Sequence, residues 1–151
     1  QHMRKMKVGK VTFTEAYKAV HEYRQKFPEK AVTFYAQNYP AMGWAVLMAG
    51  GSCPVIPCTD KTFLKDAAAM EVEETDTDNY KKMVKSDIGS IIYSKSGTEI
   101  PVQLSSGKYI LKYIHPGSGK MIVIDKSLKI NGVYKLKVPD KKEGIYWFHK
   151  L

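Results

Sequence analysis

The most constraining feature of this sequence is the apolar stretch from Ala31 to Cys58, which combines a buried-strand pattern, an apolar helix and a glycine stop. Residues 31–36 include one Thr, Thr33, in an otherwise apolar run, which is typical of a parallel strand covered on both faces. The helix that follows begins at Pro40 and stops before Gly50. This helix has no charged face, whereas a surface helix would carry a polar stripe. We therefore expect it to be covered by the C-terminal half of the chain or by a second copy of the protein.

Two further helices are expected on either side of this stretch. Thr12 and Glu15 have the spacing of a capping box, and the residues that follow are amphipathic with spacings of three and four up to residue 27. A shorter helix is expected over residues 60–70. Helix, strand and helix with short connections are typical of a repeating α/β fold, so we interpret residues 1–70 as an α-β-α segment.

An acidic run, EVEETDTD, follows at residues 71–78. It has oxygen ligands but lacks the spaced loop and glycine turn of a calcium site. We therefore interpret residues 71–87 as an acidic, solvated linker and connection.

Beyond residue 88 the hydrophobic period changes from helical to two. Short strands separated by Ser-Gly, Pro-Gly, Asn-Gly and Glu-Gly turn signals predict an antiparallel β-sandwich over residues 88–151. The predicted fold class is thus α+β, with the sandwich as a self-contained domain. The expected strands cover residues 88–93, 100–104, 109–114, 121–124, 134–138 and 145–148.

Composition limits the class of protein. The chain has 151 residues, of which 44% are hydrophobic and 26% charged, a globular composition. No segment reaches the roughly 18 apolar residues of a membrane span, so no membrane partner is expected. The formal net charge of +9 favours polyanions as partners in general.

The two cysteines, Cys53 and Cys58, could bridge a short loop, but without metal-ligand spacing around them we favour two buried thiols.

Few residues suggest chemistry. The stretch from His115 to Lys120 contains glycines and a lysine, but it lacks the spacing and the following helix of a phosphate loop, so it predicts a hairpin turn. Cys53 with a histidine gives no oriented nucleophile and base. No two acids have the look of a glycosidase pair. We predict no catalytic residue, no metal site and no cofactor. The candidate ligand-binding residues are Tyr109, Tyr113, His115, Lys120 and Trp147.

Three motifs carry a resemblance to a known family. They are the run Trp44 to Gly51 (WAVLMAGG), the stretch Tyr113 to Gly119 (YIHPGSG), and Trp147 in the closing strand. The chain resembles the C-terminal part of (β/α)8-barrel glycoside hydrolases with a trailing β-sandwich, which is often labelled a collagen-binding domain. In such enzymes the catalytic acids come from earlier barrel strands. The resemblance implies that residues 1–70 end a barrel and that this chain lacks the active site.

The resemblance predicts a non-catalytic accessory module of a carbohydrate-active enzyme, secreted or periplasmic. Its expected partners are the rest of the parent barrel and acidic polysaccharide, and self-association of the chain is a further expectation. Two alternatives stay open. One is a structural packing domain without a ligand. The other is a basic nucleic-acid-binding module, which is disfavoured because the lysines are spread over both halves of the chain.

Overall fold

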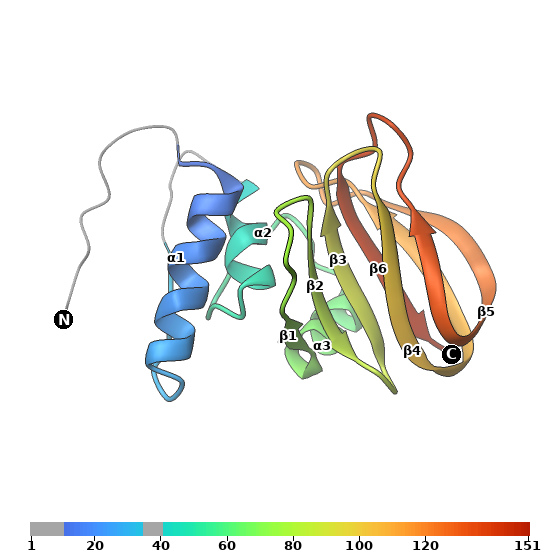
Figure 1. Cartoon of the computed structure of the whole chain (residues 1–151), viewed down its shortest axis with the longest axis horizontal. Coiled ribbons are helices and arrows are strands. Elements are labelled where there is room, and N and C mark those ends of the chain that lie inside the picture. Colours follow the sequence, from blue (N-terminus) through green and yellow to red (C-terminus); the bar gives the residue numbers. More distant parts are fainter. Residues whose placement is uncertain (1–10, 35–40) are drawn as a thin grey trace.

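The structure is a computed structural model and describes residues 11–34 and 41–151. No helix in these ranges is long and apolar enough to cross a membrane. Three helices precede an antiparallel sheet (Figure 1). The elements are α1 (Phe13–Lys26), α2 (Ala41–Met48), α3 (Lys61–Ala69), β1 (Glu71–Glu73), β2 (Tyr80–Lys85), β3 (Gly89–Ser94), β4 (Glu99–Ile114), β5 (Met121–Lys137) and β6 (Gly144–Lys150).

All three predicted helices are present. The Thr12 side chain caps α1, and Glu15 reaches back to the Thr12 backbone, which completes the predicted capping box. The predicted strand over residues 31–36 is wrong for residues 31–34, while residues 35 and 36, like Pro40, lie outside the described part. Among the described residues no strand lies beside this segment; instead Ser52 N donates a hydrogen bond to the Val32 carbonyl at 2.7 Å.

The six strands form one antiparallel sheet in the order β1-β2-β3-β6-β4-β5. Residues 109–114 of β4 pair with both β5 and β6, whereas residues 99–104 pair with β5 alone. The ladder is interrupted between Leu104 and Gly107, where an irregularity allows β4 to bend. The β4–β5 hairpin therefore turns over the rest of the sheet and encloses a core with it (Figure 1). This α+β architecture with a sandwich-like sheet confirms the predicted fold class.

The predicted strand boundaries were too short. The segments expected at residues 100–104 and 109–114 are one strand, β4, and those at 121–124 and 134–138 both belong to β5. Asn131 and Gly132, which had suggested a hairpin turn, lie inside β5, with Gly132 in the left-handed region at φ 89°. These turn signals mark bends in long strands that cross from one layer to the other.

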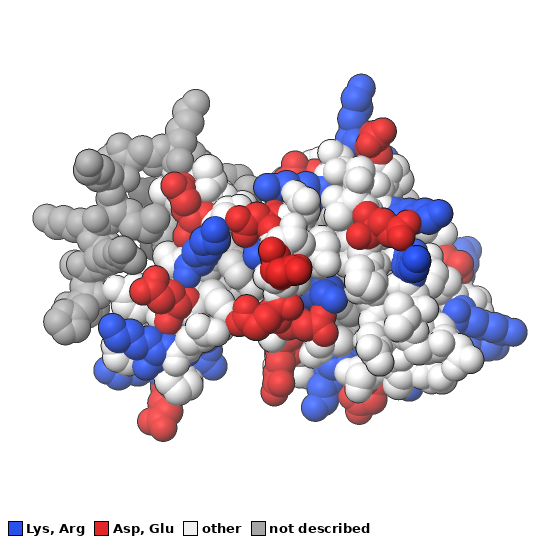
Figure 2. Space-filling model, in the orientation of Figure 1, with Lys and Arg blue, Asp and Glu red and all other residues white. Residues whose placement is uncertain are grey.

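The acidic run begins inside the sheet and continues as a loop that contacts α1, so it is not a free linker. Residues Glu71–Glu73 form β1, which pairs with β2. The loop after β1 is clamped to α1: His21 contacts Glu74 at 2.6 Å and Lys18 contacts Asp78 at 3.2 Å. Hydrogen bonds from Lys18 and then Lys81 lower the pKa of Asp78. Acidic side chains accordingly gather at the middle of one face of the molecule (Figure 2). The division of the chain at residues 70 and 88 remains a prediction.

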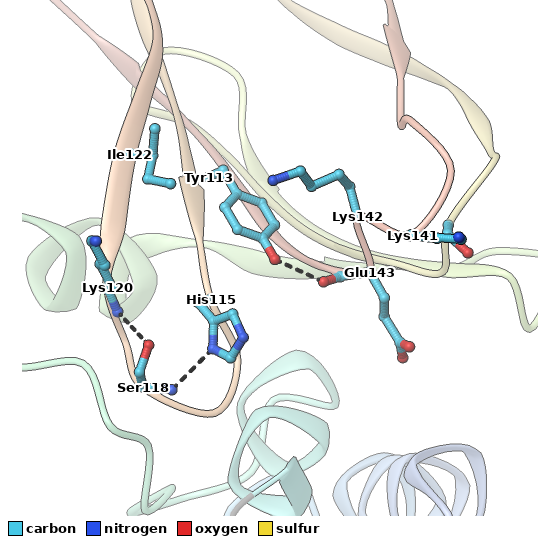
Figure 3. A pocket seen from close by; sticks show the side chains of 9 residues that line it. Tyr113, His115, Ser118, Lys120, Ile122, Lys141, Lys142 and Glu143 are labelled. Atoms are coloured by element: carbon cyan, nitrogen blue, oxygen red, sulfur yellow. Dashed lines mark hydrogen bonds between the residues drawn. The ribbon is translucent and has the colours of Figure 1, made fainter.

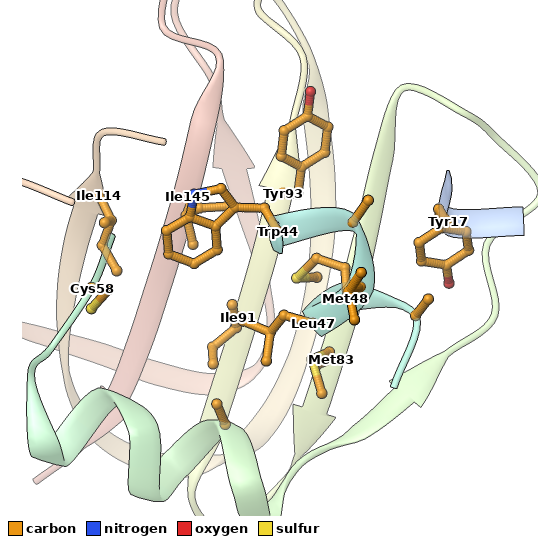
Figure 4. Close-up of a cluster of buried hydrophobic side chains, with 14 of the residues drawn as sticks. Tyr17, Trp44, Leu47, Met48, Cys58, Met83, Ile91, Tyr93, Ile114 and Ile145 are labelled. Carbon is orange, nitrogen blue, oxygen red and sulfur yellow. The ribbon is translucent and has the colours of Figure 1, made fainter. Parts of the chain in front are cut away.

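Two hydrophobic cores lie on the two faces of the sheet. One lies under the β4–β5 hairpin. The other packs α2 against β3 and β6, with Trp44 and Met48 fully buried near Ile91 and Ile145 (Figure 4). The expectation that the apolar helix is covered is confirmed, and the sheet of the same chain covers it. Both cysteines are free thiols, as predicted. Cys58 is also buried as predicted, whereas Cys53 is exposed.

Burial of tyrosines makes the stability of this fold sensitive to alkali. Burial, and then the charge of Glu74, raises the pKa of Tyr17 to about 12. A phenol with a raised folded-state pKa contributes stability that is fully present below about pH 10, its unfolded pKa, and lost as pH rises through about 12. We expect urea midpoints to fall between these values, and to fall less in Tyr17→Phe. An equal fall in the variant, measured by urea titration across this range, would contradict the assignment.

Candidate functional site

A basic pocket of about 410 Å³ lies at one end of the sandwich, where β4 leads into β5 and β5 leads into β6. Its walls come from three loops that are distant in sequence (Figure 3). The turn between β4 and β5 supplies one wall, and the β3–β4 and β5–β6 loops supply the other. The lining residues are Ser96, Tyr113, His115, Ser118, Lys120, Ile122, Lys141, Lys142 and Glu143.

The β4–β5 turn is a tight hairpin, as predicted, and it is anchored from outside. Within it, Gly119 N donates to the His115 carbonyl at 2.8 Å. The indole Nε1 of Trp44, on α2, donates to the Pro116 carbonyl at 2.7 Å. Gly119 lies so close to the backbone of Pro57 that a Cβ would sit 2.1 Å from the Pro57 oxygen. The turn is therefore held in place by residues from the N-terminal half of the chain.

The β5–β6 loop is held by tyrosine hydroxyls. Tyr113 Oη donates to the Glu143 backbone carbonyl at 2.9 Å, and Tyr93 Oη donates to the Glu143 carboxylate. Tyr146 Oη donates to the Lys142 carbonyl at 2.9 Å. Burial raises the pKa of Tyr113, with a further contribution from Glu143, and burial likewise raises the pKa of Tyr93. Both phenols remain protonated donors at neutral pH, and Glu143 is fixed at the pocket wall.

The pocket has an excess of positive charge. Lys120, Lys141 and Lys142 line it and are exposed, and Glu143 is the one carboxylate among its lining residues. None of the three lysines forms an ion pair within the described part of the chain. The Lys142 ammonium lies 5.6 Å from the centre of the Tyr113 ring, which orients it beside the pocket. Unpaired cations around a concave surface favour an anionic ligand.

His115 presents one ring nitrogen to solvent. Its Nδ1 accepts hydrogen bonds from the backbone N–H groups of Gly117 and Ser118, both at 3.2 Å. With Nδ1 acting as an acceptor, the proton of the neutral ring belongs on Nε2. The Nε2–H of this exposed side chain can then donate a hydrogen bond to an oxygen of a ligand.

The structure brings together three of the five predicted ligand residues. Tyr113, His115 and Lys120 share the pocket. Tyr109 and Trp147 are fully buried and do not line the pocket. Tyr109 Oη donates to the Ser105 carbonyl at 2.7 Å, so its polar end is already satisfied inside the protein. These two aromatics are core residues in this fold and are not part of the site.

Sequence reasoning missed the residues from the β5–β6 loop. Lys141, Lys142 and Glu143 follow a predicted strand, and the pattern predicts only a Glu-Gly turn at Glu143. A pair of lysines beside a glutamate in a turn is a weak signal, and the pocket depends on loops that are far apart in sequence. No group of three or more His, Cys, Asp or Glu side chains in residues 11–34 and 41–151 is placed to hold a metal ion.

The fold is related to that of a glycoside hydrolase. A solved structure described as "Glycoside hydrolase" matches with a TM-score of 0.58 and 12% sequence identity. The match covers 99% of this chain and 51% of the other, so this chain spans about half the length of that protein. At this identity the similarity shows a shared fold. Residues 1–70 match a family described as "Domain of unknown function (DUF6298)". No protein of curated function gives a significant match.

The structural match agrees with the sequence resemblance to glycoside hydrolases. A glycoside hydrolase-related fold is shown for the chain.

Proposed function

We propose that this chain is a non-catalytic C-terminal accessory module of a carbohydrate-active enzyme, which supports the end of a barrel and binds acidic polysaccharide. The observation that carries the proposal is the basic pocket, whose three lysines form no ion pair with any described residue, on a fold related to a glycoside hydrolase. The proposal includes the rest of the parent barrel as a partner. It also includes a secreted or periplasmic location, where polysaccharides are degraded.

The acid content of the pocket favours binding over hydrolysis. A retaining glycosidase places two carboxyl groups about 5–5.5 Å apart, and an inverting one about 6.5–9.5 Å apart. Glu143 is the one acid among the residues that line this pocket. Its carboxylate already accepts a hydrogen bond from Tyr93, which suits a fixed acceptor for a sugar hydroxyl.

The lysines favour an acidic sugar over a neutral one. A carboxylate entering the pocket would gain charge-assisted hydrogen bonds from ammonium groups that have no carboxylate partner at present. Because these ammonium groups are exposed, their attraction is screened over about 8 Å at physiological ionic strength. Binding through them should therefore weaken as salt is added.

A matched pair of double variants tests this site. We expect the Lys141→Gln/Lys142→Gln variant to bind polygalacturonate at least about tenfold more weakly, because losing even one hydrogen bond to a charged group, worth about 1.5 kcal/mol or more, changes Kd about tenfold. Lys61→Gln/Lys65→Gln removes two exposed lysines of α3, outside the pocket, and should leave affinity nearly unchanged. Calorimetry at low salt, with neutral galactan as the second ligand, measures both.

Other outcomes would favour other functions. Equal losses in the two double variants would show that net charge alone drives binding. Absence of binding to either polymer would favour a packing domain, a role that the complete burial of Trp44 and Met48 against the sheet also suits. Tighter binding to duplex DNA than to polygalacturonate would favour a nucleic-acid module. Hydrolysis of polygalacturonate or galactan that is abolished by Glu143→Gln would overturn the non-catalytic assignment.

A further inference from the structure

The edge of the sheet beside the pocket carries an unusual run of exposed apolar side chains. In the part of the chain that the structure describes, β5 is an edge strand and pairs with β4 alone. Near its start, Ile122, Val123 and Ile124 are 47%, 44% and 51% exposed. In a regular strand, alternate side chains point to opposite faces and one of the two sets is usually buried. We call these three residues the edge strip.

A bulge interrupts the regular alternation of side chains at Ile124, the last residue of the edge strip. Lys112 pairs with Val123, but the next residue back on β4, Leu111, pairs with Asp125. Ile124 is thus the extra residue of a β-bulge and has no partner on β4. Bulges next to binding sites re-aim side chains and keep an edge from pairing with other strands.

The edge strip is continuous with the pocket. Ile122 lines the pocket and belongs to the strip, and Lys120, two positions before the start of the strip, also lines the pocket. At the other end, Asp125 is turned into its own chain, since its carboxylate accepts a hydrogen bond from Ser127 N at 2.8 Å. Lys126 follows and is exposed. An apolar strip with a lysine near each end therefore extends away from the pocket along the edge.

We infer that the edge strip is a second subsite, on which further units of the acidic polysaccharide lie once one unit occupies the pocket. This inference rests on the proposed function. The apolar C–H faces of sugar rings can pack on Val123 and Ile124, next to Ile122 in the pocket, and among the described residues the outer edge of β5 presents backbone N–H and C=O groups to sugar hydroxyls. Acidic groups of the same polymer match Lys120 and Lys126 in charge. Exposed apolar patches that continue a polar site are typical of binding surfaces.

Comparing a short with a long oligosaccharide tests the second subsite separately from the pocket. The probes are digalacturonate and hexagalacturonate, measured by calorimetry at low salt. We expect Val123→Thr/Ile124→Thr, which keeps β-branched side chains, to weaken hexagalacturonate binding about tenfold and to leave digalacturonate binding unchanged. The control is Val133→Thr, also on β5 and 59% exposed but outside the pocket lining, which should bind both probes as the wild type does. Thermal unfolding of all variants checks that they are folded.

The two levels of the proposal fail in different ways. If neither probe binds the wild type, the proposed function fails. If digalacturonate binds but hexagalacturonate binds no tighter, or if Val133→Thr weakens the longer probe equally, the second subsite is overturned. Light scattering that shows a dimer, dissociated by Val123→Thr/Ile124→Thr, would make the strip an interface between copies and would also overturn it.

Discussion

Replacing Gly43 with alanine is expected to destabilise the protein by about 3 kcal/mol or more, although alanine is the better helix former by about 1 kcal/mol. Gly43 lies in α2, where the helix contacts the chain that follows it. A Cβ at this position would sit 1.7 Å from the carbonyl oxygen of Val55. The obstacle is backbone and cannot rotate away, so the helix or the segment around Val55 must move. Urea unfolding measures the loss.

Gly132→Ala is the matched control for this prediction. No atom outside its chain neighbours lies within 4 Å of a Cβ at Gly132, but the residue has φ 89°. Its cost should be limited to the strain of a left-handed residue, about 1–2 kcal/mol. If Gly43→Ala were stabilising, helix propensity would outweigh the contact, and the close packing of α2 on Val55 would be wrong.

The second large effect is expected at Asp66, a buried acid that joins α3 to β6. Its Oδ2 accepts a hydrogen bond from Trp147 Nε1 at 3.0 Å and contacts His149 Nδ1 at 2.7 Å. Trp147 is fully buried, so Asp66→Ala leaves its N–H in the core without a partner. We expect a loss of about 2–4 kcal/mol in unfolding free energy, measured in urea.

Two further variants separate the hydrogen bonds from the charge. Asp66→Asn keeps an acceptor oxygen for Trp147 and should lose less than Asp66→Ala. Asp76→Ala removes an exposed acid and should change stability by less than about 0.5 kcal/mol. Equal stabilities of Asp66→Ala and Asp76→Ala would contradict a structural role for the buried acid.

Helices were predicted well because their signals are local. The Thr12 and Glu15 capping box lies within four residues and forms as expected. The apolar pattern of α2 likewise predicted burial, although it could not say what would cover the helix. The strand expected at residues 31–36 depends on neighbouring strands, and the described residues supply none beside 31–34. Strand formation is decided by such partners, which a sequence pattern does not reveal.

The acidic run was predicted to be a linker, and this prediction was wrong for residues 71–73 for a related reason. The acidic pattern predicted a solvated linker because the α1 partners of Glu74 and Asp78 are distant in sequence. Glu73 contacts Lys82 at 2.5 Å, and the other two acids contact α1. The site shows the same limit: Tyr113, His115 and Lys120 lie close together along one hairpin and were predicted. The remaining wall comes from the β5–β6 loop, which only the folded chain places opposite them.

The anchoring of the β4–β5 turn by Trp44 bears on how such a module could be inherited. A binding domain that is transferred between enzymes by recombination must keep the geometry of its site in the new protein. Here the pocket turn is fastened to α2 by the Trp44–Pro116 hydrogen bond, and the face of the sheet with Ile91 and Trp147 is closed by the helices. A transplant of the β-rich half alone would lose that support. The pocket turn is therefore expected to keep its position only when the helices and the sheet are transferred together.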